Sequence, residues 1–181
     1  MTLKIIRVKY IVSLGIVKLL IMEEIILQIK YTEFTGLAQL PEIDAKLVSL
    51  AREATKKGYA PYSGFLVGAA VLLGNGEIIT GNNQENAAYP SGLCAERTAL
   101  FYASAQFPKV PVLAIAISTL NVGITPSEIA KPCGACRQVM AEYEDIAEYP
   151  IRILLDSSDK ILVLNGIDNL LPLRFKKEDL K

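Results

Sequence analysis

The sequence predicts an α/β fold in which helices cover a single central sheet. Two observations lead to this prediction. The chain of 181 residues is 51% hydrophobic and 21% charged, and segments with helix and strand patterns alternate along it. A chain of this length and composition buries a substantial core and fits one domain. We therefore expect one domain over residues 22–181, preceded by an extension over residues 1–21.

The extension has a pattern of its own. Basic residues lie among aliphatic ones, and its longest uncharged run, residues 10–17, is much shorter than the ~20 apolar residues that span a bilayer. No small-residue cleavage site follows, as a signal peptide requires. We interpret Met22 as the real or ancestral start and the extension as a segment without a catalytic role. An extra edge strand is the first alternative, and a weak membrane or targeting role is the second.

The first half of the domain is predicted to form a strand, a helix and a hairpin. Residues 25–31 are apolar and β-prone, which indicates a short strand. Residues 41–57 carry apolar side chains at helical spacing and end before Gly58, a residue that often terminates helices. The apolar run 65–73 continues through a Gly-Asn-Gly turn into residues 77–80, which predicts a β-hairpin.

The second half alternates between helices and strands. After a loop over residues 81–92, strong helix formers run without a break from residue 94 to residue 105. A second helix is predicted over residues 133–143. Three apolar runs indicate strands at residues 112–118, 151–155 and 161–164. From residue 41 onward the order is α-β-β-α-β-α-β-β, which favours one sheet covered by helices.

All three cysteines fall in two short motifs, and the chain has no histidine. Cys94 opens a C-A-E-R motif, and Cys133 and Cys136 lie in P-C-G-A-C. A tetrahedral transition-metal site must therefore be built from these three thiolates. Three protein ligands leave a fourth position for water, which is typical of catalytic zinc. Both motifs are expected at helix starts, where unpaired N–H groups lower the pKa of a thiol.

Charged residues beside the cysteines complete this hypothesis. Glu96 is placed to handle the protons of the water molecule. Because zinc with three thiolates carries net negative charge, we expect Arg97 and Arg137 to compensate it by hydrogen bonding to sulfur. A redox C-x-x-C pair is disfavoured because Cys94 is present and a thioredoxin-like βαβ context is not. A structural zinc site would need a fourth Cys or His ligand.

Composition narrows the partners and the location. The formal net charge is zero, whereas a protein that binds a nucleic-acid polymer needs a positive excess. A small neutral ligand suits this balance better, and no membrane partner is expected. Three cysteines without evident pairing argue against a secreted disulfide framework. The sequence therefore predicts a cytoplasmic protein.

Five motifs together extend the hypothesis: Y-A-P-Y-S-G-F (59–65), N-Q-E-N-A-A-Y (83–89), C-A-E-R (94–97), P-C-G-A-C-R-Q (132–138) and L-L-P-L-R-F (170–175). In this order they resemble the cytidine deaminase family, in particular its small homotetrameric three-cysteine class. The resemblance implies a three-layer α-β-α sandwich around a mixed five-stranded sheet. It also implies one Zn²⁺ per subunit. The implied reaction is hydrolytic deamination of cytidine and deoxycytidine to uridine and deoxyuridine, with release of ammonia, in pyrimidine salvage.

The resemblance also implies roles for individual residues. Glu96 would move a proton from water to N3 of the ring and then a proton to the departing amino group. The Ala95 carbonyl would accept a hydrogen bond from the exocyclic amine. Asn83 and Glu85 would hold the ribose hydroxyls, although ordinary loop polarity is the alternative. Phe65 would pack against the pyrimidine ring, with a core role as its competitor.

The resemblance also implies that one residue contributes to the active site of a neighbouring subunit. Phe175 matches an aromatic residue that family members contribute to a neighbouring subunit's pocket, so we expect a homotetramer with shared active sites. Tyr89 either reaches across an interface or packs locally. Arg174 departs from the small or apolar residues common at that position, and either alters the pocket rim or faces solvent. The nearest rival function is that of a sibling such as blasticidin-S deaminase, and a zinc-dependent interaction module is the rival from another class.

Overall fold

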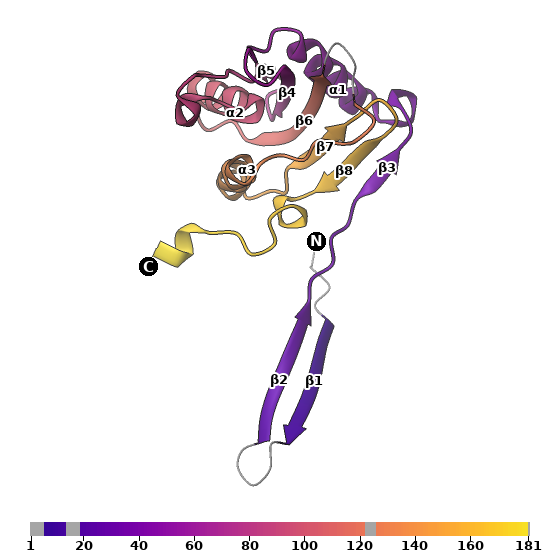
Figure 1. Cartoon of the computed structure of the whole chain (residues 1–181), viewed down its shortest axis with the longest axis vertical. Helices are drawn as coiled ribbons and strands as arrows, with labels where there is room; N and C mark the ends of the chain where they lie inside the picture. The colour runs from indigo at the N-terminus through magenta and orange to yellow at the C-terminus, as the bar shows by residue number, and fades with distance from the viewer. Residues whose placement is uncertain (1–5, 14–18, 122–125, 181) are drawn as a thin grey trace. The chain divides into compact units, whose positions relative to one another are not determined.

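The computed structural model describes residues 6–13, 19–121 and 126–180 (Figure 1). Contacts divide the chain into two compact units at the boundary between Lys30 and Tyr31. In the first unit, β1 (Ile6–Ser13) and β2 (Leu19–Ile26) pair as an antiparallel hairpin. These two strands form a sheet of their own and not an edge of the larger sheet. The predicted boundary after residue 21 falls inside β2, and residues 1–5 and 14–18 of the predicted extension lie outside the described residues.

The second unit is built on a mixed six-stranded sheet with the order β3-β8-β7-β6-β4-β5. Its strands are β3 (Thr32–Phe34), β4 (Phe65–Leu73), β5 (Ile78–Asn82), β6 (Val112–Asn121), β7 (Arg152–Asp156) and β8 (Ile161–Asn165). Of the neighbouring pairs, β6 and β7 run parallel and the others run antiparallel. The helices are α1 (Glu42–Thr55), α2 (Ala95–Gln106) and α3 (Gly134–Ala147). Short 3₁₀ segments are η1 (Leu37–Gln39), η2 (Tyr89–Ser91), η3 (Ile167–Asn169) and η4 (Lys177–Leu180).

The mixed α/β fold is confirmed, with two corrections. The sheet has six strands and not five, because β3 pairs with β8 at one edge. The predicted strand 25–31 is wrong beyond Ile26, where β2 ends. The prediction followed the β-prone composition of residues 25–31. The strand that joins the large sheet comes later, at Thr32–Phe34, and is only three residues long. Its backbone pairing with a distant strand leaves no apolar pattern in the sequence.

The three-layer arrangement follows from the distribution of buried apolar residues. On one face of the sheet, Leu47, Val48 and Ala51 of α1 pack in one hydrophobic cluster. On the other face, α2 and α3 share a second cluster that includes Leu100 and Met140. Figure 1 shows α2 and α3 side by side on the face opposite α1. The two helices that begin with cysteine motifs are therefore neighbours.

Two glycines allow the helices to approach the sheet closely. A Cβ at Gly68 of β4 would lie 2.1 Å from the Ala51 carbonyl oxygen of α1. A Cβ at Gly81 of β5 would lie 2.5 Å from the Ala99 amide nitrogen and 2.7 Å from the Ala95 carbonyl oxygen of α2. Only glycine fits at such distances, because any larger side chain would push the helix outward. Gly81 therefore fixes the depth of the first turn of α2.

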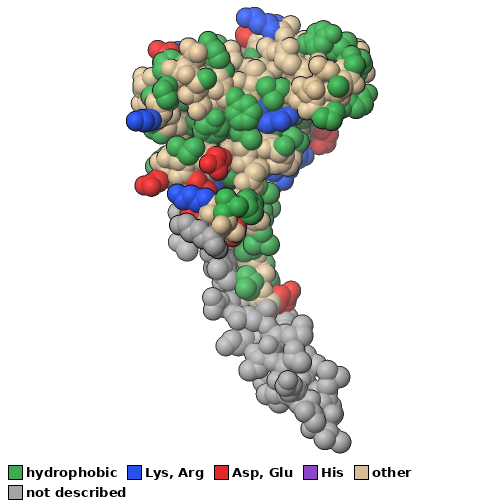
Figure 2. All heavy atoms as spheres, turned by 90° about the vertical axis from the view of Figure 1, so that its left-hand side faces the viewer, with side chains coloured by type: hydrophobic (Ala, Val, Ile, Leu, Met, Phe, Trp, Pro, Cys, Tyr) green, Lys and Arg blue, Asp and Glu red, His purple; other side chains and the backbone are tan. Residues whose placement is uncertain are grey.

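Charges of both signs are interspersed on the outer surface. Figure 2 shows acidic, basic and apolar side chains mixed over the face that carries α2 and α3. This mixture accords with a formal net charge of zero. None of the helices in the described ranges is long and apolar enough to cross a membrane.

Candidate active site

The two cysteine motifs stand at the starts of neighbouring helices, as predicted. Cys94 is the N-cap of α2 and Cys133 is the N-cap of α3, and both have extended backbone conformations. Neither side chain caps its own helix, so both sulfur atoms are free to point across the gap between the helices. Cys136 follows one turn into α3 and is fully buried. Three thiols from two helices thus converge.

The spacing of the sulfur atoms fits a single zinc ion. The Sγ atoms of Cys94 and Cys133 are 3.9 Å apart, and those of Cys133 and Cys136 are 3.5 Å apart. All three lie within 4.8 Å of one another. Tetrahedral zinc with Zn–S bonds of about 2.3 Å requires sulfur atoms about 3.8 Å apart. Cys94, Cys133 and Cys136 therefore form the binding site for one Zn²⁺ per chain, and no fourth protein ligand joins them among the described residues.

Two of the thiols have opposite tendencies to ionise. A hydrogen bond with Cys136, together with the nearby Arg97 guanidinium, lowers the pKa of Cys94 to about 5. The same hydrogen bond with Cys94, followed by burial, raises the pKa of Cys136. The pair thus holds one proton, and Cys94 is the first to become a thiolate. Because zinc binds thiolates, its binding would release the remaining protons.

Glu96 lies beside these sulfur atoms in the first turn of α2. Its side chain is almost completely buried, with 4% of the residue exposed. Burial raises the pKa of this carboxyl group, and the Cys94 thiolate raises it further. Raising a carboxyl pKa toward neutrality favours proton transfer in both directions. Glu96 is therefore suited to accept and donate protons at the metal site.

The two arginines that follow the cysteine motifs behave differently. Arg97 donates a hydrogen bond from Nη2 to Cys94 Sγ at 3.5 Å. Arg137 instead donates to two carbonyl oxygens, those of Pro132 and Leu170, each at 2.8 Å. The hydrogen bonds of Arg137 therefore connect the loop before Cys133 to the C-terminal segment and do not go to sulfur.

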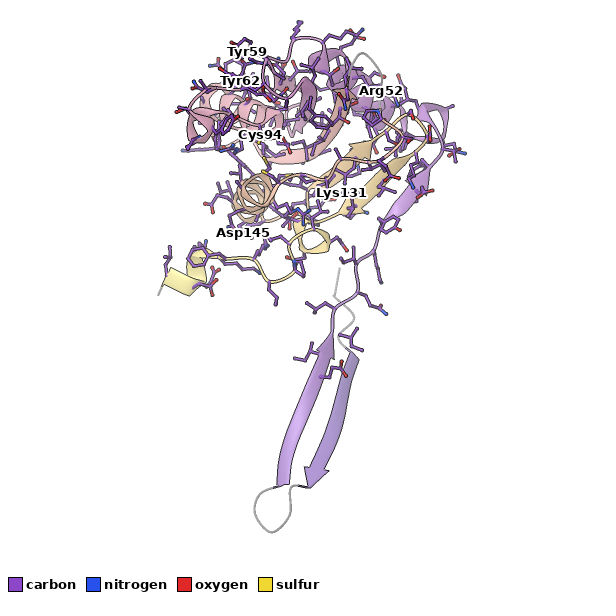
Figure 3. The ribbon with its side chains drawn as sticks, viewed as in Figure 1. Arg52, Tyr59, Tyr62, Cys94, Lys131 and Asp145 are labelled. Carbon is purple, nitrogen blue, oxygen red and sulfur yellow. The ribbon has the colours of Figure 1, made fainter. Side chains whose placement is uncertain are left out.

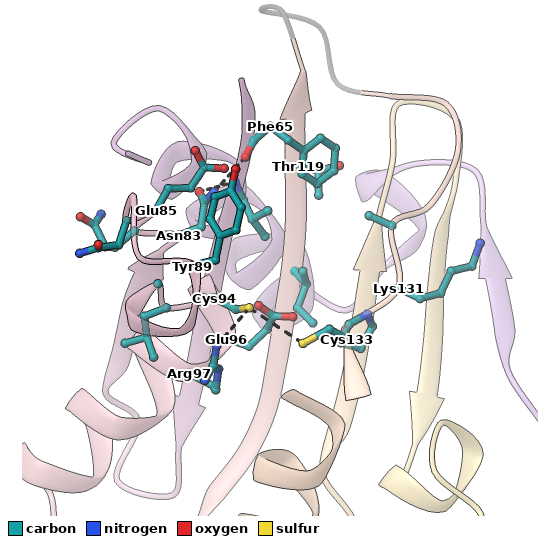
Figure 4. Close-up of a pocket in the computed structure, with 18 residues that line it drawn as sticks. Phe65, Asn83, Glu85, Tyr89, Cys94, Glu96, Arg97, Thr119, Lys131 and Cys133 are labelled. Atoms are coloured by element: carbon teal, nitrogen blue, oxygen red, sulfur yellow. Dashed lines mark hydrogen bonds between the residues drawn. The ribbon is translucent and has the colours of Figure 1, made fainter. Parts of the chain in front are cut away.

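Cys94, Cys133 and Glu96 line a pocket of about 380 Å³ (Figure 4), a volume that suits a small molecule. We call Cys94, Glu96 and Cys133 the floor of this pocket. We call Phe65, Asn83 and Glu85 its rim. The structure thus brings seven predicted site residues to one cavity, these six and Arg97, with metal and proton groups at one end and hydrogen-bonding groups at the other.

The polar rim residues are held by hydrogen bonds to the backbone. Asn83 accepts from the Val67 amide at 2.8 Å and donates to the Phe65 carbonyl at 2.9 Å. Glu85 accepts from the Tyr62 amide at 2.9 Å and from the Ser63 hydroxyl group. The Ser63 hydrogen bond, followed by that of the Tyr62 amide, lowers the pKa of Glu85. Glu85 therefore presents an ionised carboxylate, which acts only as an acceptor.

Two predicted substrate residues do not line the pocket of their own chain. Ala95 is fully buried, and its carbonyl oxygen faces Gly81 of β5. Phe175 is 56% exposed on the C-terminal segment. Tyr89 does line the pocket, where it is 77% exposed and makes an edge-to-face contact with Tyr62.

The sequence did not single out several pocket residues. Ile117 and Thr119 of β6 line the pocket, as does Lys131 before the second cysteine motif. The Thr119 hydroxyl oxygen is buried and has no hydrogen-bond partner among the described residues. Ile117 and Thr119 lie two positions apart on β6 and share a face, so strand periodicity could have found them once that face was known. In Figure 4 the Lys131 side chain points away from the floor.

The fold and the floor together define a class of protein. A metal centre of three thiolates, open to a pocket and accompanied by a buried carboxylate, has the composition of a catalytic zinc site in which water is the fourth ligand. The chain is therefore a zinc-dependent hydrolase.

Comparisons with known proteins assign the family. The family model described as "Cytidine and deoxycytidylate deaminase zinc-binding region" matches residues 41–151. A cytidine deaminase from Halalkalibacterium halodurans is 40% identical over 134 residues, which cover 74% of this chain and 95% of that protein. One from Sporosarcina psychrophila is 39% identical over 135 residues, covering 75% and 93%.

Solved structures agree with this assignment. The crystal structure of cytidine deaminase from Burkholderia pseudomallei aligns with a TM-score of 0.62 and 36% identity, covering 75% of this chain and all of that one. The chain belongs to the cytidine and deoxycytidylate deaminase family, as the five motifs predicted.

Proposed function

We propose that this enzyme hydrolyses cytidine and deoxycytidine to uridine and deoxyuridine with release of ammonia, a step of pyrimidine salvage. The observation that carries the proposal is the buried Glu96 carboxylate beside three convergent thiols, at the floor of a pocket with hydrogen-bonding groups at its rim. The named relatives from Halalkalibacterium halodurans and Sporosarcina psychrophila are cytidine deaminases, which supports the same substrate.

The proposed chemistry depends on proton transfer by Glu96. When bound, zinc would supply a hydroxide nucleophile by lowering the pKa of water to about 7. Glu96 would accept a proton from the attacking water and deliver it to N3 of the pyrimidine ring as a C–O bond forms at C4. It would then carry the proton of the new C4 hydroxyl group to the amino group, so that the C4–N bond breaks and ammonia leaves. Arg97, through its contact with Cys94 Sγ, offsets the negative charge of the three thiolates.

The rim is proposed to bind the sugar and the ring. The ionised Glu85 carboxylate accepts hydrogen bonds from ribose hydroxyl groups, and the Asn83 amide keeps capacity for a further hydrogen bond beyond its two backbone contacts. Phe65 packs against the pyrimidine ring. A contact between the Ala95 carbonyl and the exocyclic amine stays a prediction, since Ala95 does not line the pocket.

The chain is proposed to act as a homotetramer in the cytoplasm. Phe175 is largely exposed and does not line its own pocket, which supports its contribution to the pocket of a neighbouring subunit. Exposed aromatic residues on α2, Phe101 and Tyr102, offer further apolar surface for association. The three free cysteines suit a reducing compartment, in which thiols stay available to metal.

A direct assay tests the proposed reaction. The purified full chain, with zinc content measured by mass spectrometry, is incubated separately with cytidine, deoxycytidine, cytidine monophosphate and blasticidin S. Ultraviolet absorbance and ammonia release report conversion. We expect turnover of the two nucleosides and much weaker turnover of the other two compounds. Absence of nucleoside conversion by zinc-loaded protein would refute the proposal, and preferred conversion of blasticidin S would assign the rival function.

Mixing experiments test the shared site. Glu96→Gln chains lack the proton carrier, and Phe175→Ala chains lack the aromatic side chain donated to a neighbour. Co-expressed mixed oligomers of the two variants are expected to recover part of the wild-type activity, because some pockets combine an intact Glu96 with an intact Phe175. Sedimentation should give the mass of four chains. A fully active monomer would contradict the shared site.

A further inference from the structure

The Arg174 side chain is buried where the C-terminal segment lies against α3. Its side chain is only 7% exposed. One Nη2 atom lies 2.8 Å from Asp145 Oδ1 and 3.8 Å from Glu144 Oε1, and Nη1 donates to the Ala141 carbonyl at 3.0 Å. Nε lies 3.2 Å from Asp168 Oδ1, an ion pair without hydrogen-bond alignment. Arg174 thus neither faces solvent nor lines the pocket, contrary to both alternatives drawn from the sequence.

The residues beside Arg174 have the opposite exposure. Leu173 is 89% exposed and Phe175 is 56% exposed. A guanidinium group is costly to bury without partners, and here three carboxylates and a carbonyl surround it. The burial of Arg174 therefore holds this segment against the protein while its apolar neighbours remain outside.

Three residues of the C-terminal segment, Leu170, Arg174 and Phe175, make polar contacts with α3. Besides Arg174, the Leu170 carbonyl accepts from Arg137 and the Phe175 carbonyl accepts from Gln138, each at 2.8 Å. The α3 partners recur at helical spacing and share one face of the helix: Arg137, Gln138, Ala141, Glu144 and Asp145. Figure 3 shows Asp145 on the side of α3 that faces the C-terminal segment.

This face of α3 is fixed to the rest of the fold. Glu144 accepts hydrogen bonds from the Ile151 and Ile167 amides, each at 2.9 Å, and so joins α3 to the start of β7 and to η3. The same helix begins at Cys133 and carries Cys136 in its first turn. The segment that bears Phe175 is therefore attached to the helix that supplies two of the three thiolates.

Resting on the proposed function, we propose that Arg174 is a positioning residue that fastens residues 170–175 to α3 and so presents the Phe175 ring to the pocket of a second copy of the chain. Without the arginine, the segment would occupy the binding-competent position only part of the time. Apparent affinity falls by that fraction, while the chemistry at the floor is unchanged. The loss of apparent affinity cannot exceed the loss caused by removing the Phe175 ring itself.

A double-mutant cycle measures this dependence. Phe175→Ala is expected to raise the KM for cytidine about ten- to hundredfold, the range for loss of one base–aromatic stack. Arg174→Ala should raise KM about tenfold with kcat changed less than twofold. In the Phe175→Ala background, Arg174→Ala should change KM less than twofold. Arg174→Lys, which keeps the charge but loses the planar fork, should recover part of the affinity.

Matched variants separate positioning from general damage. Lys56→Ala removes one cation from an exposed ion pair at the C-terminal end of α1 and should leave KM unchanged. If Arg174→Ala does not fold, Asp145→Asn weakens the shortest contact at a site that is 30% exposed and takes its place in the cycle. Equal effects of the Arg174 change in both backgrounds, or an unchanged KM in the Phe175 wild-type background, would overturn the proposal.

Hydrogen exchange tests, without any substrate, whether Arg174 attaches residues 170–175 to α3. Peptides covering residues 168–181 should exchange faster in Arg174→Ala than in the wild type, while peptides from α1 stay unchanged. Unchanged exchange in the C-terminal peptides would overturn the proposal even if the enzyme deaminates cytidine. Conversely, if wild-type protein lacks nucleoside turnover, the proposed function fails on its own, and the exchange rates still decide whether Arg174 holds the segment.

Discussion

The floor and the rim of the pocket each contain one glutamate, and the two carboxylates have opposite environments. Glu96 on the floor is almost fully buried, and burial raises its pKa. Glu85 on the rim is partly exposed and accepts hydrogen bonds from the Ser63 hydroxyl and from the Tyr62 and Ser63 amides, which lower its pKa. Desolvation disfavours the charged form of a carboxyl group, whereas donated hydrogen bonds favour it.

This contrast divides the work of the site. A carboxyl group whose pKa moves toward neutrality exchanges protons with a substrate, and one that stays ionised accepts hydrogen bonds steadily. Changes at the floor should therefore reduce kcat or metal binding, and changes at the rim should raise KM. The following predictions, from the largest expected effect to the smallest, test that division.

Removal of a buried thiol should have the largest effect. Cys136→Ser replaces a fully buried zinc ligand by a hydroxyl group that binds zinc poorly. We expect zinc content to fall far below one ion per chain and activity to fall below detection. Mass spectrometry and the cytidine assay measure both. Ala135→Ser adds the same hydroxyl group at the preceding exposed position and should retain both. Stoichiometric zinc in Cys136→Ser would show that two thiolates suffice.

Loss of the proton carrier should affect the reaction alone. Glu96→Gln keeps the size of the side chain but cannot take up or deliver the proton, so kcat should fall by about 10²–10⁴-fold. Zinc content should stay at one ion per chain, and the thermal melting temperature should not fall, because no buried charge is left unpaired. A kcat within tenfold of wild type would assign proton transfer to another group and remove the contrast with the rim.

How far the sequence predicts the fold depends on where each element finds its partners. The helices and most strands were predicted within a few residues, because their buried faces leave periodic apolar patterns; β4 matches residues 65–73 at both ends. Residues 27–31 were mistaken for strand because β propensity describes composition and not pairing. The backbone of β3 pairs with β8, whose residues lie more than a hundred positions along the chain, and such pairing is invisible locally.

For the site, the chemical type of a residue was easier to predict than the partner toward which its side chain points. With no histidine and three cysteines, the metal ligands had few alternatives. The orientation of Arg137 was missed because one of its two acceptors, the Leu170 carbonyl, lies 33 residues away. The burial of Arg174 depends on three carboxylates from α3 and η3 that converge only in the fold. Thr119 belongs to none of the five motifs, and its position in the pocket follows only from the face of β6 that lines this pocket.

A neutral substitution at the rim should act on binding. Glu85→Gln removes the ionised acceptor and exchanges part of it for a donor, so we expect the KM for cytidine to rise about tenfold. The kcat should change less than threefold, because the floor is intact. Glu77→Gln makes the same change at an exposed position in the turn between β4 and β5 and serves as the control. A fall in kcat with unchanged KM would place Glu85 in the chemistry and erase the division between floor and rim.

Lowering the pH should have the smallest effect on nucleoside binding, and the pH at which binding weakens identifies the group responsible. Hydrogen bonds to Glu85 hold its pKa below the ordinary value of 4.5. Stabilisation from a lowered pKa is fully present above the ordinary value and is lost as pH falls through the lowered one. The inhibition constant of a non-reacting nucleoside such as uridine should therefore stay within twofold from pH 7 to pH 5 and weaken only below pH 4.5. In Glu85→Gln this acid limb should vanish. Weakening already between pH 6 and pH 5 in the wild type would mean that a group with a raised pKa governs binding, and the rim would then resemble the floor.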